Sequence, residues 1–520
     1  MKNNADAKNV LGMEIKMNTP IYDFVRQYAK SGVSRLHMPG HKGTGMLGVE
    51  ALDITEISGA DSMYEAEGII AQSEQNASAL FDTGATFYST EGSSQCIRAM
   101  LYLALLHWRE RYADRVAENT VKREGMSVGA PSTRPVVVAA RNAHKAFLVA
   151  AALLDFDIVW LWSEKQEMGE QNSKEEKVSV VPYDDGSCNS QRAKQTENAG
   201  QGLHSICACT VTEEQLRHTL GGLSVPPAAV YLTSPDYLGG QLDIAVLAEV
   251  AHEAGTLLLV DDAHGAYQHF LPVSKHPMDL GADICCDSAH KTLPVLTGGA
   301  YLHIARTAPQ KLIGEARQAL ALFGSTSPSY LIMQSLDLAN RYLAEGYRER
   351  LAECVAALDE LKERLKEYGW QFVASDPLKL TIAAAECGYT GTELAAALRR
   401  EKIECEYADP DFLVLMLTPE NSAEDMERLY QCLAKRPVRE AVAHTIPGMQ
   451  PPEVVCTVRE ATFAPHEWIS VGAGAIGRVL AAATVHCPPA IPVVVSGERI
   501  GEDAVRVLEY YGIEEVCVVR

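Results

Sequence analysis

The sequence predicts an α/β protein with a large, mostly parallel sheet covered by helices on both faces, followed by a smaller α/β unit. Candidate strands alternate with helical patterns from about residue 68 to residue 310, as βαβ units require. A second, shorter alternation follows a long helical stretch that begins at residue 330. The 520 residues exceed what one hydrophobic core holds, so two or three domains are expected.

Residues 1–50 are predicted to form an N-terminal arm, with one amphipathic helix at 21–30. Residues 51–310 are predicted to form the large domain, with helical patterns at 68–81 and 94–118. A polar stretch at 163–205 looks like an insertion. The strand candidates of the large domain are 135–140, 158–162, 228–232, 256–260 and 283–286.

Residues 311–520 are predicted to form the smaller C-terminal region. A helical stretch at 330–368 opens it. Two strand candidates then alternate with two helical patterns, which is again typical of an α/β unit. These elements are the strands at 379–384 and 412–417 and the helices at 391–401 and 422–434.

The charge balance is acidic, with 68 acidic and 46 basic residues and a net charge of −22. Nucleic-acid binders show a basic patch, so no nucleic-acid partner is expected. The first residues lack an apolar signal segment, and the apolar runs are far shorter than the ~20 residues of a membrane span, which favours a cytoplasmic protein without a membrane partner. The 13 cysteines form no CxxC pair and no cluster at zinc spacing, so no metal is expected.

A lysine after one strand and an aspartate after the preceding strand give the first indication of chemistry. Lys291 ends the segment SAHK at 288–291, and Asp261 directly follows the most apolar strand candidate, 256–260. Ligands bind at the carboxyl ends of strands in open α/β sheets. A lysine amine forms a Schiff base with an aldehyde cofactor, and a carboxylate keeps a pyridine nitrogen protonated. The pair indicates pyridoxal phosphate (PLP), although each residue alone is more often a surface lysine or a helix N-cap.

Three other segments carry residue types that the same cofactor uses. The turn TEGSSQ at 90–95 precedes a helix and offers backbone N–H groups to a phosphate, although such turns are more often only helix caps. His144 follows the strand candidate 135–140 and suits stacking on a ring, although alone it is more often a surface histidine. Thr233 follows the strand candidate 228–232 and suits contact with the ring oxygen. The convergence of several strand ends favours PLP.

Five motifs carry a family resemblance. They are HMPGHK at 37–42, RNAHK at 141–145, TSP at 233–235, DDAHG at 261–265 and SAHKTLP at 288–294. Together they resemble the Orn/Lys/Arg decarboxylase family, PLP-dependent enzymes of the aspartate aminotransferase fold (fold type I). The resemblance runs from about residue 20 to residue 498. Because no receiver-like domain precedes the helix at 21–30, the chain resembles the short form of the family.

The resemblance implies a catalytic role for each matching residue. Lys291 would carry the cofactor as a Schiff base, and Asp261 would pair with its pyridine nitrogen. His144 would stack above the ring, and Ala263 would pack under it. Lys291 and His290 are alternative donors of the proton that returns to Cα.

The resemblance also implies a phosphate site and a dimer. Ser93 and Ser94 would cradle the phosphate, with Ser288 and His290 nearby. Thr326, in STSP at 325–328, matches the stretch by which a neighbouring subunit reaches that phosphate. A homodimer with shared active sites is therefore expected.

The segment VGAGAIG at 471–477 matches the glycine pattern of a dinucleotide fingerprint, and Glu498 lies about twenty residues beyond it. The rest of a mononucleotide-binding half would need more chain than the residues after it supply. The resemblance places a structural turn and helix at these glycines, and we interpret them in this way.

The predicted reaction is decarboxylation of a basic L-amino acid, first arginine to agmatine and carbon dioxide in polyamine synthesis, then lysine or ornithine. Carboxylates such as Glu467 would recognise the distal cation of the substrate. One alternative is an aminotransferase or carbon–sulfur lyase of the same fold, which needs an arginine clamp that the sequence does not reveal. A second alternative is a non-catalytic binding protein, which the intact Lys291, Asp261 and His144 disfavour.

Overall fold

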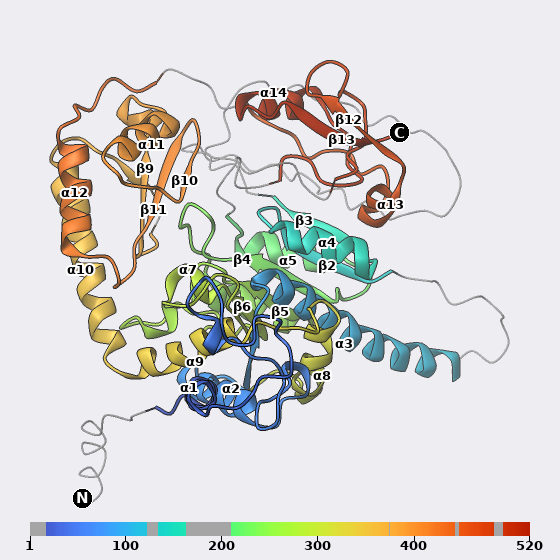
Figure 1. Ribbon diagram of the computed structural model, residues 1–520. Coiled ribbons are helices and arrows are strands. Elements are labelled where there is room, and N and C mark those ends of the chain that lie inside the picture. Colours follow the sequence, from blue (N-terminus) through green and yellow to red (C-terminus); the bar gives the residue numbers. More distant parts are fainter. Residues whose placement is uncertain (1–16, 122–133, 163–209, 374, 443–446, 483–491) are drawn as a thin grey trace, which may run out of the picture.

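The computed structural model describes residues 17–121, 134–162, 210–373, 375–442, 447–482 and 492–520. A seven-stranded sheet forms the centre of the large domain (Figure 1). Its strands, in spatial order, are β1 (Ala85–Ser89), β7 (Ala300–Ile304), β6 (Ile284–Asp287), β5 (Leu257–Asp261), β4 (Ala229–Thr233), β2 (Val136–Ala140) and β3 (Asp157–Leu161). The strands from β6 to β3 pair in parallel, and β7 is antiparallel to both neighbours. The prediction of a mostly parallel sheet is confirmed.

Helices cover both faces of this sheet, because successive strand residues point to opposite sides and both sides are apolar. Val137 and Leu259 face a layer formed by α3, α4 and α8, whereas Val138 and Leu258 face α5 and α6. The bounds of these helices are α3 (Ser93–Val121), α4 (Lys145–Leu154), α5 (Glu213–Gly221), α6 (Ile244–Glu253) and α8 (Gln310–Ala321).

The N-terminal arm packs on the large domain through α1. This helix contacts α2 and α9, with α1 at Pro20–Lys30, α2 at Ile69–Leu80 and α9 at Tyr330–Ala344. The buried carboxylate of Asp337 joins the three helices, because it accepts hydrogen bonds from Tyr22 N at 2.9 Å and from Ser73 Oγ at 2.6 Å. Burial raises the pKa of Asp337 to about 6.

A four-stranded antiparallel sheet forms the next unit, shown in orange in Figure 1. Its spatial order is β10 (Tyr407–Ala408), β11 (Phe412–Met416), β9 (Lys379–Ala383) and β8 (Phe372–Val373), with helices α10 (Tyr347–Lys366), α11 (Gly391–Arg400) and α12 (Ala423–Ala434). Lys379 Nζ donates to Asp236 O at 2.8 Å, and Thr381 Oγ1 donates to Leu238 O at 2.6 Å. These bonds attach the small sheet to the loop that follows β4.

The last part of the chain forms a two-stranded unit, shown in red in Figure 1, with α13 packed against α4. Its elements are α13 (Val458–Phe463), β12 (His466–Ser470), α14 (Glu502–Tyr510) and β13 (Glu515–Val519). Arg141 and Glu498 attach this unit to the large domain, with Nη1–Oε1 and Nη2–Oε2 distances of 2.7 Å each. Their side chains are only 1% and 2% exposed, so the ion pair is buried.

Several strands, among them β8, β10 and β13, and one helix boundary differ from the sequence prediction. The strands β1 and β7 were not predicted, although they complete one edge of the large sheet. The helical stretch predicted at 330–368 is two helices, α9 and α10. Gly346 separates them with a φ of +71°, a conformation that favours glycine, and so the chain turns there.

The glycines of segment 471–477 form a turn after β12, and the described residues up to 482 contain no helix after that turn. Strands β12 and β13 are antiparallel, whereas a dinucleotide fingerprint needs a parallel βαβ unit. Glu498, the acidic residue of the apparent fingerprint, is paired with Arg141. The structural turn is confirmed, whereas the helix expected with it is absent from the described residues up to 482.

The domain boundaries near residues 50 and 310 stay predictions. The proposed insertion at 163–205 lies outside the described residues. None of the helices in the described ranges has both the length and the apolar character that crossing a membrane requires.

Candidate active site

The carboxyl ends of β2, β4, β5 and β6 lie side by side, because these strands are consecutive in the sheet. Thr233 at the end of β4 is paired in register with Asp261 at the end of β5, and Asp261 is paired with Cys286 in β6. The segments after β2 and β6 carry His144 and Lys291. The structure confirms the sequence prediction that these strand ends lie at one edge of the sheet.

Lys291 lies in the short helix α7 (Ala289–Thr292), which directly follows β6. Its Nζ atom is 2.9 Å from His264 Nε2. Burial lowers the pKa of the Lys291 amine, while the nearby carboxylates of Asp261 and Glu406 oppose this shift. A depressed pKa increases the neutral, nucleophilic fraction of a lysine amine.

Asp261 is held in one orientation by its neighbours. Tyr231 donates its hydroxyl proton to Oδ2 at 2.9 Å, and Ala263 N donates to Oδ1 at 3.2 Å. The thiol of Cys286 approaches Oδ1 at 3.6 Å. Asp261 is 2% exposed, so its orientation is set by the protein rather than by solvent.

His144 caps the first turn of α4, because its Nδ1 atom accepts a hydrogen bond from Ala146 N at 3.2 Å. The side chain keeps an exposed surface although protein atoms crowd around it. Burial lowers the pKa of His144, while attraction to Asp261 raises it and repulsion from Lys291 lowers it further. A neutral imidazole with one open side suits stacking on a ring.

The predicted phosphate residues meet at the start of α3. Ser288 Oγ donates to Ser93 Oγ at 2.8 Å, and both residues are buried. Ser94 follows Ser93 in the first turn of the helix and is partly exposed. The N-terminus of a long helix attracts an anion through its free N–H groups and dipole.

Two predicted residues occupy less central positions. His290 is partly buried, and its Nδ1 atom is hydrogen-bonded to Gly299 O at 2.9 Å. Thr326 is exposed. Ser325 N, next to it, donates to Glu91 Oε1 at 2.5 Å, which brings this segment to the turn before α3 of the same chain. The reach of Thr326 into a neighbouring subunit stays a prediction.

These residues fit PLP. An amine, a carboxylate and an imidazole with an open side share one sheet edge, beside a helix N-terminus. His264 Nδ1 is buried and has no hydrogen-bond partner in the described ranges. Such an atom is expected to bond to a bound group, because buried polar atoms in native proteins are almost always satisfied.

The sequence analysis assigned no role to His264, Tyr231 or Glu406. The residue types alone carried no signal for them, since each acts through a contact that only the fold creates. Glu467, the predicted cation-binding carboxylate, instead accepts a hydrogen bond from Arg478 Nη2 at 2.7 Å. That ion pair, in the C-terminal unit, lowers the pKa of Glu467.

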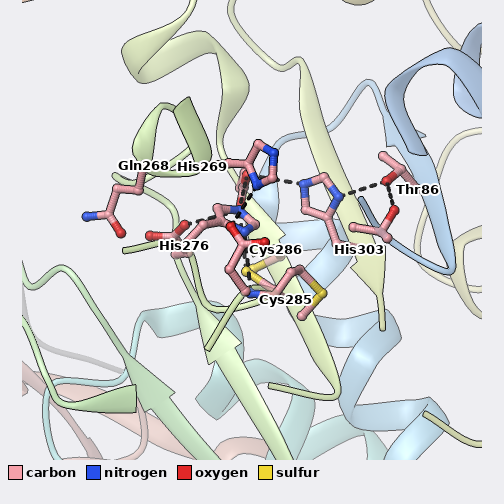
Figure 2. A network of polar contacts seen from close by, with 12 residues as sticks. Thr86, Gln268, His269, His276, Cys285, Cys286 and His303 are labelled. Carbon is pink, nitrogen blue, oxygen red and sulfur yellow. Dashed lines mark hydrogen bonds and ion pairs between the residues drawn. The ribbon is translucent and has the colours of Figure 1, made fainter. Parts of the chain in front are cut away.

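A buried polar network lies behind the strand ends (Figure 2). Asp287 accepts hydrogen bonds from His276 Nε2 and His303 Nε2, each at 3.1 Å, and His303 Nδ1 lies 2.8 Å from Thr86 Oγ1. Although burial opposes it, these histidines hold the pKa of Asp287 below its usual range. Asp287 precedes Ser288, so the network fixes the chain just before the segment that carries Lys291.

Four groups of this region, from Asp262, His276, Cys285 and Asp287, have possible metal-ligand atoms within 4.8 Å of one another. The hydrogen bonds favour protons there instead. Met278 N donates to His276 Nδ1 at 3.4 Å, which leaves the imidazole proton on Nε2, the atom that faces Asp287. Burial raises the pKa of both Asp262 and Cys285 well above their usual values, whereas metal ligands are deprotonated.

A comparison with known protein families identifies the family that the large domain resembles. Residues 125–381 match the family described as Orn/Lys/Arg decarboxylase, major domain. This segment of the chain therefore matches the major domain of the Orn/Lys/Arg decarboxylase family. The family prediction, the decarboxylase prediction and the PLP prediction are thereby confirmed.

Curated relatives cover nearly the whole chain. Arginine decarboxylase of Bacillus subtilis is 27% identical over 518 residues, which is 93% of this chain and 92% of the relative. A second Bacillus subtilis protein, named uncharacterized protein YaaO, is 27% identical over 522 residues, 95% of this chain and 94% of the relative. Arginine decarboxylase of Halalkalibacterium halodurans is 24% identical and covers 94% of this chain and 92% of its own length.

Solved structures of two lysine decarboxylases have a similar fold. Lysine decarboxylase LdcF of Francisella novicida superimposes with a TM-score of 0.71 at 14% identity, covering 98% of this chain and 82% of its own. The constitutive lysine decarboxylase of E. coli gives a TM-score of 0.67 at 16% identity, covering 97% and 82%. The prediction of the fold class is confirmed. The family match and the arginine decarboxylase relatives support decarboxylation of a basic amino acid.

Proposed function

We propose that this decarboxylase converts L-arginine to agmatine and carbon dioxide, a step of polyamine synthesis. The observation that carries the proposal is the near full-length similarity to Bacillus proteins named arginine decarboxylase, at 22–27% identity. Lysine and ornithine are the competing substrates within the family.

Each site residue has a role in this proposal. Lys291 Nζ holds PLP covalently, and Asp261, oriented by Tyr231, keeps the ring nitrogen protonated. His144 would stack on one face of the ring, and Ala263 would pack against the other. When bound, PLP supplies an electron sink for the pair left on Cα as carbon dioxide departs.

The phosphate subsite in this proposal is the start of α3. Ser93, Ser94 and Ser288 surround it, with His290 at its edge and Thr233 on the ring-oxygen side. A neighbouring subunit would add Thr326, so we propose a homodimer with shared sites, working in the cytoplasm. Sedimentation velocity of the purified protein tests the dimer, and a monomer at micromolar concentration contradicts it.

Proton transfer to Cα is assigned to Lys291. His264 Nε2, 2.9 Å away, accepts a hydrogen bond from the Lys291 amine, because burial lowers the pKa of His264 and keeps its imidazole neutral. His290 is turned toward Gly299 O and supports the segment instead.

The test is carbon dioxide release by the purified, PLP-supplemented protein from arginine, lysine and ornithine, each supplied separately. We expect release from arginine together with agmatine, and loss of both in Lys291→Ala. Release from lysine or ornithine alone overturns the choice of substrate. A keto acid in place of carbon dioxide overturns the decarboxylation.

A further inference from the structure

A cavity of about 360 Å³ lies in the small-sheet unit, between α11 and the segment that follows α12 (Figure 1). Three arginines line it: Arg400 at the end of α11, and Arg436 and Arg439 in the segment after α12. Leu394 and Ala397 of α11 give it an apolar wall. Its volume is in the range of small-molecule sites, roughly 300–1,000 Å³, and it contains none of the active-site residues.

The three guanidinium groups of this cavity lack carboxylate partners. Within the ranges that the structure describes, Arg400, Arg436 and Arg439 form no ion pair, whereas the neighbouring Arg399 is paired with Glu404 at 2.7 Å. The whole chain has 68 acidic and only 46 basic residues. The cavity is therefore a basic site on an otherwise acidic protein.

Glu393, the carboxylate among the lining residues, is engaged at the other end of α11. Its Oε2 atom accepts from Thr390 N at 2.9 Å, and Thr390 Oγ1 accepts from Glu393 N at 3.1 Å. This capping box begins the helix, whereas Arg400 ends it. Seven residues of helix separate the two, about 10 Å at 1.5 Å per residue, and so Glu393 does not neutralise the arginines.

The backbone around the cavity is fixed by contacts between its two sides. Tyr389, just before α11, is 6% exposed, and its hydroxyl donates to Pro437 O at 2.7 Å. Arg439 N donates to Cys387 O at 3.1 Å. The segment after α12 is thus bonded to the segment before α11, and the cavity between them is preformed.

Two of the arginine side chains are positioned as well. The Arg439 guanidinium lies 4.3 Å from the centroid of the Tyr389 ring. Arg436 Nη1 donates to Cys432 O and lies 3.1 Å from Cys432 Sγ. A cation–π contact uses no N–H group, and the Cys432 contacts use only Nη1, so both arginines keep donors for a ligand.

Stabilisation of helix ends accounts for only part of this arrangement. Basic side chains are favourable at helix C-termini, which gives a structural reason for Arg400 at the end of α11 and for Arg436 after α12. Arg439 belongs to neither helix end. The convergence of all three on one preformed cavity requires another explanation, and an anionic ligand supplies it.

We propose that this cavity, the arginine pocket, binds a small phosphorylated molecule. The guanidinium fork matches phosphate oxygens bidentately, and three such groups suit a ligand with two or three negative charges. A monocarboxylate would need only one of them. The apolar wall of Leu394 and Ala397 suits the organic part of the molecule. This second binding site is separate from the proposed reaction and does not depend on it.

The experiment measures the calorimetric Kd of pyrophosphate, the probe, for the PLP-loaded protein, in which the phosphate position of the active site is filled. The variants are Arg439→Gln and Arg400→Gln, both at exposed positions. Arg399→Gln is the matched control, because it removes the same charge next to Arg400 but outside the cavity. Ala396→Glu keeps every arginine and places a carboxylate at an exposed lining position.

We expect stoichiometric binding to the wild type. Arg439→Gln and Arg400→Gln should each raise the pyrophosphate Kd about 10- to 100-fold, the effect of one hydrogen bond to a charged group. Ala396→Glu should raise it at least as much, and Arg399→Gln should match the wild type. Unchanged absorbance of bound PLP should show that all variants are folded.

A wild type that binds no pyrophosphate at millimolar concentration overturns the inference. So does an equal Kd in Ala396→Glu, Arg439→Gln and Arg399→Gln, which would mean attraction to the surface in general. Citrate, a tricarboxylate, is titrated in parallel, and tighter binding of citrate than of pyrophosphate overturns the choice of phosphate.

Discussion

Replacing Glu498 by glutamine is expected to destabilise the attachment of the C-terminal unit strongly. The change keeps the shape of the side chain, removes its charge and replaces one acceptor oxygen by an NH2 donor. Arg141 then remains buried, 1% exposed, with both of its 2.7 Å bonds to Glu498 weakened and no other carboxylate paired with it in the described ranges. Leaving one partner of a buried ion pair uncompensated costs about 3–5 kcal/mol.

Tryptophan fluorescence during urea unfolding is a direct assay of this loss. The Arg141 guanidinium lies 4.8 Å from the ring centroid of Trp160 and 4.4 Å from that of Trp162, so two of the five tryptophans report on it. We expect the transition of these tryptophans to move to lower urea concentration by an amount that corresponds to about 3–5 kcal/mol.

Glu467→Gln is the matched control. It breaks the pair with Arg478 in the same unit, but those side chains are 42% and 33% exposed, so we expect a much smaller loss of stability than for Glu498→Gln. A Glu498→Gln variant that loses no more stability than Glu467→Gln would refute the reasoning.

Two further predictions concern buried titratable groups. Because burial raises the pKa of Asp337 to about 6, above the ~3.9 of an unfolded aspartate, its contribution to stability is complete below about pH 4 and is lost as pH rises through 6. Relative to Asp337→Asn, the wild type should lose about 2–3 kcal/mol over that range in urea titrations, and parallel curves would contradict this. Mass spectrometry of the purified protein should find no stoichiometric metal at His276 and Asp287, since His276 Nε2 carries a proton. One zinc ion per chain, removed together with stability by a chelator, would show the opposite.

Much of the fold follows from local pattern, and the exceptions have physical causes. The parallel strands are apolar on both faces, and so β5 and β4 were found within one residue. The unpredicted β7, Ala300–Ile304, carries a buried histidine, His303, whose polarity is compensated by Asp287 and Thr86. Asp287 and Thr86 lie 16 and 217 positions from His303 in the chain. The residues around His303 therefore do not by themselves predict a buried strand.

Some residues of the candidate site could likewise be predicted from the sequence, and others could not. Lys291, Asp261 and His144 follow predicted strands, and because parallel strands end at one edge, their proximity could be deduced from the sequence. Glu406, whose charge acts on Lys291, could not be deduced, because it belongs to the small-sheet unit and its partner Tyr237 is 169 residues away in the chain. Its residue type is common on surfaces, and only the contacts distinguish it from Glu404.

The ion pair of Arg141 and Glu498 also orders the assembly of the protein in time. The two residues are separated by 357 positions, so at 5–20 residues per second a ribosome needs roughly 20–70 s to supply the second after the first. During that interval the guanidinium of Arg141 lacks its carboxylate partner. The C-terminal unit can therefore attach to the large domain through this ion pair only after nearly the whole chain has been made.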